Sequence, residues 1–201
     1  MGFIAIIDYG AGNLMSVVNA LNFLGYENVV TSNVGEICRA ERIILPGVGA
    51  FPSAIENLRE KALDVVLREQ AAVKPFLGIC LGMQMLFERS FEIEECEGLG
   101  LIPGAVRRIK TDLKLPHIGW NSLEFANPSP LLNDVPEGTY VYYVHSFCAE
   151  TERENLVAAS DYGECVAGIV SSGSVFGCQF HPEKSGEMGL RILKNFCEVQ
   201  I

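Results

Sequence analysis

The sequence predicts an α/β fold of three layers, in which helices cover both faces of a mostly parallel central sheet and an antiparallel extension follows. In the first half of the 201-residue chain, short apolar runs alternate with amphipathic stretches and glycine-rich turns. This alternation is typical of βαβ units, which build a parallel sheet with right-handed crossovers. From about residue 99, short apolar runs follow one another between Gly, Pro, Asn and Ser clusters, as in antiparallel strands.

Length and composition indicate a single domain over residues 1–201. Hydrophobic residues make up 49% of the chain and charged residues 20%, and no linker, repeat or low-complexity run interrupts it. The formal net charge is −10. We expect no nucleic-acid partner, because phosphate binding depends on clustered Lys and Arg, and the one basic group of note is Arg107, Arg108 and Lys110.

The seven cysteines are odd in number and lack C-x-x-C spacing. This pattern suggests neither a disulfide framework nor a zinc site, and we expect a reducing compartment, the cytoplasm. The apolar run at residues 3–7 is too short for a signal or membrane segment, so no membrane partner is expected.

The first strand is expected at residues 3–7, and the turn DYGAGN at residues 8–13 follows it. Apolar residues then recur at helical spacing from Leu14 and stop near Gly25, which predicts a helix. A glycine-rich turn between strand and helix could cradle a phosphate, but this one lacks the third glycine of the dinucleotide fingerprint. We therefore interpret it as a tight connection.

The second and third strands are expected at residues 29–31 and 42–45, and the third leads into PGVGAF at residues 46–51. A helix around residues 54–70 comes next. Loops that follow parallel strands lie at the carboxyl edge of the sheet, where binding crevices form. We therefore expect DYGAGN, PGVGAF and the turn at Cys80 to lie on the same edge.

Residues 74–88, KPFLGICLGMQMLFE, predict a strand, a sharp turn at Cys80 and a helix. Gly78 and Gly82 flank the cysteine as G-x-C-x-G, the sulfur counterpart of the nucleophile elbow, where a Cβ at either glycine would collide with the adjoining strand or helix. At the start of a helix, the macrodipole favours a thiolate, and the amide of Leu81 points to where an oxyanion could form. The alternative is a buried structural cysteine.

The second half of the chain is expected to contain six short strands and a final helix. The strands are predicted at residues 105–109, 122–125, 139–144, 156–160, 166–170 and 175–180. The helix is predicted at residues 188–199, where apolar residues recur at helical spacing.

A base for Cys80 must come from three histidines, His117, His145 and His181. The proline after His181 favours extended backbone, in which residues two apart point the same way. Glu183 can then accept a hydrogen bond from one imidazole nitrogen while the other faces a thiol, as in a catalytic triad. His145 is a rival base without an acid two residues on, and we interpret His117 as fixing a turn.

Four motifs together resemble the class I glutamine amidotransferases over essentially the whole chain: GICLGMQ, FHPEKS, PGVGAF and YVHSF. Two more, DYGAGN and LPHIGWN at residues 115–121, are similar to those of the glutaminase subunits of imidazole glycerol phosphate synthases. The resemblance implies the fold class above and hydrolysis of L-glutamine to L-glutamate and ammonia, with the ammonia passed to a partner cyclase in a heterodimer. A thiolate mechanism needs no metal and no organic cofactor.

The resemblance also implies roles for particular residues. Cys80, His181 and Glu183 would form the triad, and the amides of Leu81 and Val48 would hold the oxyanion. The amino-acid end of glutamine would be held by Gly49, Gln84, Glu92, His145, Ser146 and Phe147. Apart from the resemblance, Asn13 and Lys184 lie on neighbouring loops beside the expected crevice, and we expect them at the partner interface.

Other function classes remain open at this point. They are a glutaminase subunit of another synthase (anthranilate, guanylate or pyridoxal phosphate), a stand-alone cysteine amidase, and a scaffold protein with Cys80 in its core. We also expect the isolated chain to be a poor glutaminase. The β-branched Val48 resists positive φ, so its amide can rest in an unproductive orientation until a partner shifts the loop.

Overall fold

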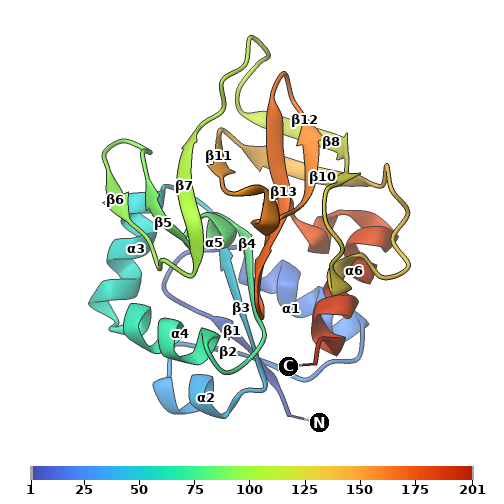
Figure 1. Cartoon of the computed structure of the whole chain (residues 1–201). Coiled ribbons are helices and arrows are strands. Elements are labelled where there is room, and N and C mark those ends of the chain that lie inside the picture. The colour runs from blue at the N-terminus through green and yellow to red at the C-terminus, as the bar shows by residue number, and fades with distance from the viewer. Residues whose placement is uncertain (1, 201) are drawn as a thin grey trace.

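The computed structural model describes residues 2–200 as an eight-stranded sheet with helices on both faces and two smaller sheets beside it (Figure 1). The strand order of the large sheet is β2-β1-β3-β4-β14-β13-β12-β9. Its parallel part comprises β2 (Asn28–Thr31), β1 (Ile4–Ile7), β3 (Arg42–Gly47), β4 (Phe76–Cys80) and β14 (Val175–Cys178). The predicted fold class is confirmed.

Helices cover both faces because the central strands are buried and successive side chains point to opposite sides. On one face, Ile4 and Ile6 of β1 belong to a core cluster with α1 (Leu14–Phe23) and α6 (Gly186–Glu198). On the other, Ala5 and Ile7 belong to a cluster with three helices, α2 (Val34–Arg39), α3 (Phe51–Glu60) and α4 (Leu63–Ala71). Figure 1 shows α1 and α6 on the right of the sheet and the other three on the left.

The antiparallel strands fall into three groups. The strands β13 (Cys165–Ser172), β12 (Leu156–Asp161) and β9 (Glu124–Phe125) extend the large sheet. A ribbon pairs β8 (His117–Ser122) with β10 (Tyr140–His145). The third group has the order β11-β7-β5-β6 and consists of β11 (Phe147–Glu150), β7 (Ile102–Arg108), β5 (Phe87–Ser90) and β6 (Cys96–Glu97), with β5 and β7 parallel to each other.

One strand lies elsewhere than expected. The sequence placed residues 175–180 in the antiparallel extension, but β14 pairs in parallel with β4 and antiparallel with β13. All four of its residues are buried, as a strand between two sheet neighbours requires. The carboxyl end of β14 therefore reaches the same edge as the carboxyl end of β4, and this brings His181 to Cys80.

Three further expectations are wrong in detail. The single helix at residues 54–70 is two helices, because Ala62 has a φ of 51° and interrupts the chain between α3 and α4. The helix after Cys80 is the single turn α5 (Leu81–Gln84), and Phe87 already begins β5. The strand at residues 122–125 is divided between β8 and β9. A fully buried run gives no amphipathic period, so residues 85–87 could not be separated from a helix by pattern.

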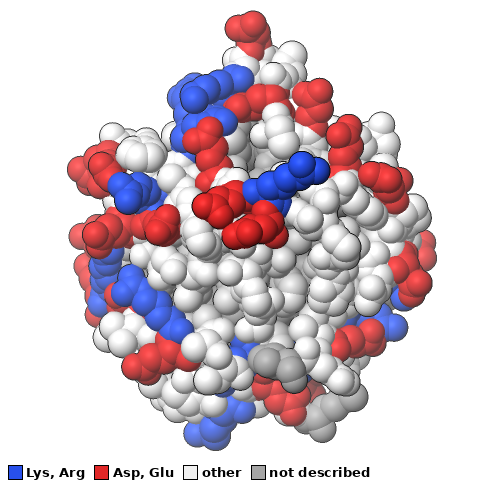
Figure 2. Space-filling model, viewed as in Figure 1, with Lys and Arg blue, Asp and Glu red and all other residues white. Residues whose placement is uncertain are grey.

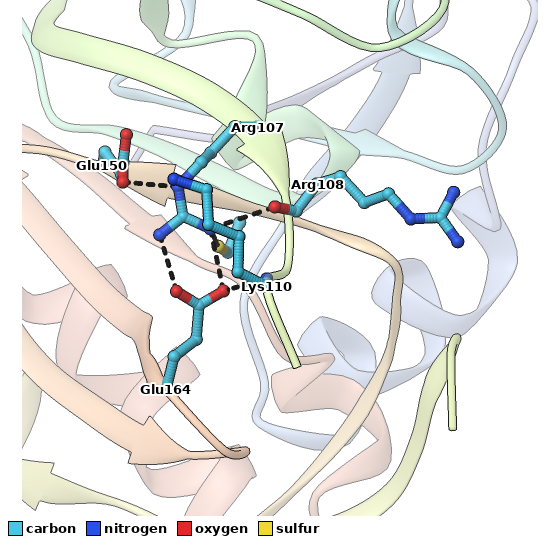
Figure 3. Close-up of polar contacts among 6 residues, drawn as sticks. Arg107, Arg108, Lys110, Glu150 and Glu164 are labelled. Carbon is cyan, nitrogen blue, oxygen red and sulfur yellow. Dashed lines mark hydrogen bonds and ion pairs between the residues drawn. The ribbon is translucent and has the colours of Figure 1, made fainter. Parts of the chain in front are cut away.

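Of the basic group of Arg107, Arg108 and Lys110, the side chain of Arg107 forms ion pairs within the described residues 2–200. The guanidinium of Arg107 donates to both carboxylate oxygens of Glu164, at 2.8 and 2.7 Å, and to Glu150 (Figure 3). The Lys110 amide also donates to Glu164, and the Arg108 side chain points away from the cluster. This bidentate pair ties β7 to the β12–β13 turn, so the charge of Arg107 serves the fold.

The charges on the surface are mixed in sign. Figure 2 shows acidic and basic side chains side by side near the middle and along the margin of the face that it presents, with a largely uncharged area below the middle. Among residues 2–200, no helix is both long and apolar enough to cross a membrane.

Candidate active site

Cys80 lies at a strained turn between β4 and α5. Its φ of 55° and ψ of −113° are conformations that a residue with a side chain rarely adopts, at a cost of about 1–3 kcal/mol. The flanking glycines allow this turn. A Cβ on Gly82 would lie 1.7 Å from the Leu45 carbonyl oxygen, and one on Gly78 would lie 2.6 Å from the Gly82 oxygen. The predicted elbow and its steric reason are confirmed.

The expected effect of a helix macrodipole on Cys80 is wrong in size. A helix of four residues has few aligned peptides, so the macrodipole at α5 is small. The unpaired amides of the first turn remain, and the Leu81 amide is one of them. The positively charged neighbour of the sulfur is instead His181, which lines the same cavity and whose pKa the Cys80 side chain raises.

His181 lies between the sulfur and a buried carboxylate. Its Nδ1 is 2.9 Å from Oε1 of Glu183, whose side chain is 1% exposed. Burial disfavours the charged ring, but the hydrogen bonds with Cys80 and Glu183 outweigh burial and raise the pKa of His181 to about 10. The nitrogen that does not face Glu183 is left to face the thiol. The three residues therefore have the geometry of a nucleophile, a base and an orienting acid.

The backbone around His181 is also fixed, by residues that sequence reasoning missed. The His181 amide donates to the carbonyl of Tyr142 at 3.0 Å, and the Ser185 hydroxyl donates to the His181 carbonyl at 2.6 Å. The same hydroxyl oxygen accepts from the Tyr142 amide at 2.9 Å. Ser185 thus joins the triad turn to β10. Its only signal in the sequence was a hydroxyl four residues after the histidine.

A cavity of about 330 Å³ opens beside the triad and brings most of the predicted site residues together. Eleven of the thirteen residues that line it were named from the sequence: Val48, Gly49, Cys80, Leu81, Gln84, Glu92, His145, Ser146, Phe147, His181 and Lys184. Pro116 and Val144 complete the lining. Glu183 lies behind His181, and Asn13 does not line the cavity.

Gln84 lines the cavity, but both of its amide hydrogens are engaged within the protein. Its Nε2 donates to the carbonyl of Phe147 and to Oε1 of Gln179, each at 3.0 Å. The Gln179 amide nitrogen in turn lies 3.9 Å from the Cys80 sulfur. Only the carbonyl oxygen of Gln84 is therefore left for a ligand. Sequence reasoning missed Gln179, although it precedes His181 by two residues.

Glu92 is half-buried at the cavity and shares its carboxylate with the fold. One oxygen accepts a hydrogen bond from the Phe51 amide at 2.8 Å, at the N-terminus of α3. This contact attaches the loop before β6 to the end of PGVGAF. The second oxygen has no partner among the described residues and remains for a cationic ligand group.

His145 is not the base for Cys80. Its Nδ1 lies 2.7 Å from the carbonyl oxygen of Phe147, and its Nε2 lies 3.0 Å from Nδ1 of His117. Both ring nitrogens are thereby engaged away from the sulfur. Burial lowers the pKa of His145 to about 4, and of His117 likewise to about 4, so both rings are neutral at pH 7.

Of the two residues expected at a partner interface, Lys184 lines the cavity and Asn13 does not. Lys184 is exposed and Asn13 is half-buried, and neither side chain has a hydrogen bond or ion pair with another residue of the described range 2–200. Val48 is 43% exposed and has no positive φ, whereas Gly49 next to it has a φ of 105°. The mouth is thus flanked by side chains that the chain itself does not use.

Comparison with known proteins relates this chain to the glutamine amidotransferases. The family described as Glutamine amidotransferase class-I matches residues 5–199. Imidazole glycerol phosphate synthase subunit HisH of Bacillus cereus (strain B4264) is 56% identical over 194 residues, which cover 96% of this chain and 93% of the relative. The subunit of the same name from Bacillus mycoides (strain KBAB4) is 53% identical with the same coverage.

Solved structures share the fold at lower identity. A crystal structure of a glutamine amidotransferase superposes with a TM-score of 0.78 at 18% identity and covers 98% of both chains. The structure of PurLQS from Thermotoga maritima superposes with a TM-score of 0.68 at 22% identity, again over 98% of both chains.

Proposed function

This chain belongs to the class I glutamine amidotransferase family, and from that membership we propose that it is the glutaminase subunit of an imidazole glycerol phosphate synthase. It hydrolyses L-glutamine to L-glutamate and ammonia, and the ammonia passes to a cyclase partner in histidine biosynthesis. The observation that carries the proposal is the presence of Cys80, His181 and the buried Glu183 carboxylate at one cavity.

Acylation starts with the Cys80 thiolate, which attacks the carboxamide carbon of glutamine. A C–S bond forms and the carbonyl electron pair moves to oxygen, where the amides of Leu81 and Val48 would hold the negative charge. The imidazolium of His181 gives its proton to the amide nitrogen. The C–N bond then breaks, ammonia leaves, and a thioester remains on Cys80.

Deacylation uses the same groups in reverse order. Neutral His181 takes a proton from water, and the resulting hydroxide adds to the thioester carbon. The second oxyanion collapses, the C–S bond breaks, and glutamate leaves with the thiolate restored. Glu183 holds the imidazole by its Nδ1 through both halves and stabilises the imidazolium, without itself taking the proton. No step requires a metal or an organic cofactor.

The cavity suits a ligand with the polar groups of an amino acid. The free carboxylate oxygen of Glu92 would accept from the α-ammonium group, and the carbonyl oxygen of Gln84 faces the same space. Gly49 and the segment of His145, Ser146 and Phe147 would contact the remaining polar atoms through their backbone. These assignments follow from which residues line the cavity and which of their polar atoms have no hydrogen-bond partner within the protein.

The cyclase would dock over the cavity mouth, on the outer face of the β8–β10 ribbon. Because side chains alternate along a strand, Ile118 and Trp120 of β8 and Tyr140 and Val144 of β10 point outward together, and each is more than a third exposed. A contiguous exposed apolar surface of this kind is typical of a protein interface. Val144 also lines the cavity, so this surface is continuous with the active site. Lys184 and Asn13 would add polar contacts at its rim.

Seven free cysteines among residues 2–200 fit a reducing compartment, and we place the protein in the cytoplasm on this ground.

The function is tested by measuring glutamate release from L-glutamine by the purified chain, alone and with a cyclase subunit and its ligand. We expect release in the complex, at a rate about 10²- to 10³-fold above that of the chain alone, because one oxyanion donor is missing until the partner docks. A diazoketone analogue of glutamine should alkylate Cys80 and no other thiol. Equal turnover with and without the cyclase would favour the stand-alone amidase, and no glutamate in either case would refute the glutaminase.

A further inference from the structure

A chain of hydrogen bonds runs from the β8–β10 ribbon to the active-site cavity, and its first links fix the tautomers of two histidines. A carbonyl oxygen can only accept, so Nδ1 of His145, 2.7 Å from the Phe147 oxygen, must carry its proton. Burial lowers the pKa of His145 to about 4, so at pH 7 its Nε2 is a bare acceptor, and the contact at 3.0 Å requires that Nδ1 of His117 donates to it. Both rings are therefore neutral and protonated at Nδ1.

The hydrogen bonds of Asn121, at the outer end of this series, agree with His117 as the donor to His145. The Asn121 side chain is oriented by its other contacts, because its Nδ2 donates to the Asp161 carbonyl at 2.8 Å and its oxygen accepts from the Ser122 amide at 2.9 Å. The same Nδ2 lies 3.5 Å from Nε2 of His117, which is the unprotonated nitrogen. In this series of hydrogen bonds, each donor thus faces an acceptor.

His117 is held in place without touching the cavity. Its ring is stacked between Tyr143, at a centroid distance of 4.7 Å, and Tyr162, at 3.8 Å, and it is 3% exposed. It does not line the cavity, whereas His145 does. Any effect of His117 on the reaction must therefore act through His145.

The inner end of the chain reaches the nucleophile. The Phe147 carbonyl accepts from His145 on one side and from Gln84 on the other, at 3.0 Å. Gln84 continues to Gln179 at 3.0 Å, and Gln179 to the Cys80 sulfur at 3.9 Å. The Phe147 carbonyl is thus the junction between the ribbon and the wall that carries Cys80.

We propose that His117 and His145 are positioning residues for glutamine hydrolysis. As neutral rings protonated at Nδ1, they fix the Phe147 carbonyl, and with it the cavity wall at Ser146 and Phe147, relative to Cys80. The effect on catalysis rests on the proposed function, whereas the tautomer assignment does not. Protonation of His145 at Nε2 would remove the acceptor and break the link, so the wall is fixed only while both rings are uncharged.

The surroundings keep the rings neutral. The titratable or charged groups around them are Tyr143, Tyr162, His181 and, on the cavity that His145 lines, Lys184, Cys80 and Glu92. No Asp or Glu side chain of residues 2–200 makes a hydrogen bond or ion pair with either ring. Charging the pair would place a cation beside the His181 imidazolium, whereas Glu92, the acid that lines the cavity, makes its hydrogen bond to the Phe51 amide.

The first experiment reads the tautomers directly, in the full-length ¹⁵N-labelled chain. Only three histidines are present, so long-range ¹H–¹⁵N spectra are simple, and His117→Phe and His145→Asn assign the signals. At pH 7 we expect His117 and His145 to show the Nδ1–H pattern, and neither to titrate between pH 5.5 and 8. A ring protonated at Nε2 alone, or a titration near 6.5, would overturn the proposal whatever the enzyme's activity.

The second experiment measures the effect on glutamine in the complex with a cyclase. His117→Phe keeps an aromatic ring between the tyrosines but removes the donor, and His117→Asn restores an amide N–H near the position of Nδ1. We expect His117→Phe to raise KM for glutamine about tenfold with a smaller change in kcat, because the acceptor on His145 is left unpaired. The acid limb of kcat/KM should also move to higher pH, and His117→Asn should recover most of both changes.

Two results would contradict the positioning role: an unchanged KM and pH profile in a folded His117→Phe protein, or equal damage from both variants. Thermal unfolding of each variant shows whether it is folded. If His117→Phe does not fold, the wild-type tautomers still test the hydrogen-bond directions on which the positioning role depends.

Discussion

The two walls of the active-site cavity are held by different forces. The nucleophile wall, formed by β4 and α5, depends on backbone packing, since the Gly82 Cα lies so close to the Leu45 carbonyl that no Cβ fits. The ribbon wall, formed by β8, β10 and residues 145–147, depends on side-chain hydrogen bonds through His117, His145 and Phe147. One wall is fixed by steric exclusion, and the other by bonds that each contribute about 0.5–1.5 kcal/mol.

Because the two walls are held differently, we expect them to differ in how easily they can be adjusted. A strained nucleophile must stay in one conformation, and close packing allows no alternative. A wall held by a few hydrogen bonds can be adjusted by a change at its outer surface, where Ile118 and Trp120 are 59% and 55% exposed. We therefore expect changes in the nucleophile wall to abolish catalysis and changes in the ribbon wall to alter binding.

The largest effect is expected for Cys80→Ala. Removal of the nucleophile should lower ammonia release roughly 10⁵-fold or more, with the fold unchanged because alanine fits the site. In the wild type, iodoacetamide should modify Cys80 first, since burial raises the pKa of Cys148 and of Cys197 to about 12. Peptide mapping after brief labelling checks this. Earlier modification of Cys38, which is exposed, would argue against an activated Cys80.

The next effect separates the base from its orienting acid. His181→Ala should lower kcat about 10⁴-fold, because it removes proton transfer in both half-reactions. Glu183→Gln should lower kcat less than His181→Ala does, since the side-chain amide can still contact the ring but does not stabilise its charge. Single-turnover assays with labelled glutamine measure both. A fully active His181→Ala protein would make His145 the base after all.

The same pair predicts how stability depends on pH. The pKa of His181 is raised in the folded protein to about 10, so its charge adds stability below about pH 6.5, and this stability is lost as the pH rises toward 10. The unfolding free energy of wild type minus that of His181→Ala should therefore be largest near pH 6 and shrink toward pH 10. Urea titrations at several pH values measure the difference. A difference that grows with pH would mean that the ring is neutral in the folded state.

A smaller effect is expected on the outer surface of the ribbon wall. Trp120→Ala should weaken binding of a cyclase subunit about 10- to 30-fold, because a large aromatic side chain leaves the proposed interface. Phe23→Ala is the matched control, since Phe23 is 79% exposed on α1 but lies outside that surface. Titration calorimetry gives both affinities. Equal effects of the two changes would remove the ribbon from the interface.

The smallest effect on catalysis is expected behind the ribbon wall, at the ion pair shown in Figure 3. Arg107→Met should lower the unfolding free energy by about 1–3 kcal/mol, because Glu164 loses two charge-assisted hydrogen bonds, and KM for glutamine should not change. Arg108→Met is the control, as that side chain points away from the cluster. A rise in KM for Arg107→Met alone would show that β7 and β11 also set the position of Phe147.

The sequence alone predicted the fold class, the elbow at Cys80 and the pairing of His181 with Glu183. The elbow and the pairing rest on interactions between residues close together in the chain. The glycines two residues either side of Cys80 relieve its own turn, and Glu183 reaches His181 because the residue between them is proline. Buried strands alternating with helices allow few arrangements, so the class followed from the pattern.

Only the tertiary structure decided what holds those residues against the substrate. The place of β14 beside β4, the contact of Gln84 with Gln179, and the pairing of His117 with His145 join segments far apart in the chain. Such contacts depend on which strands become neighbours and in what register, and a shift of one residue would turn each side chain to the other face. No local pattern encodes that register, because many packed cores and adjacent strands fix it together.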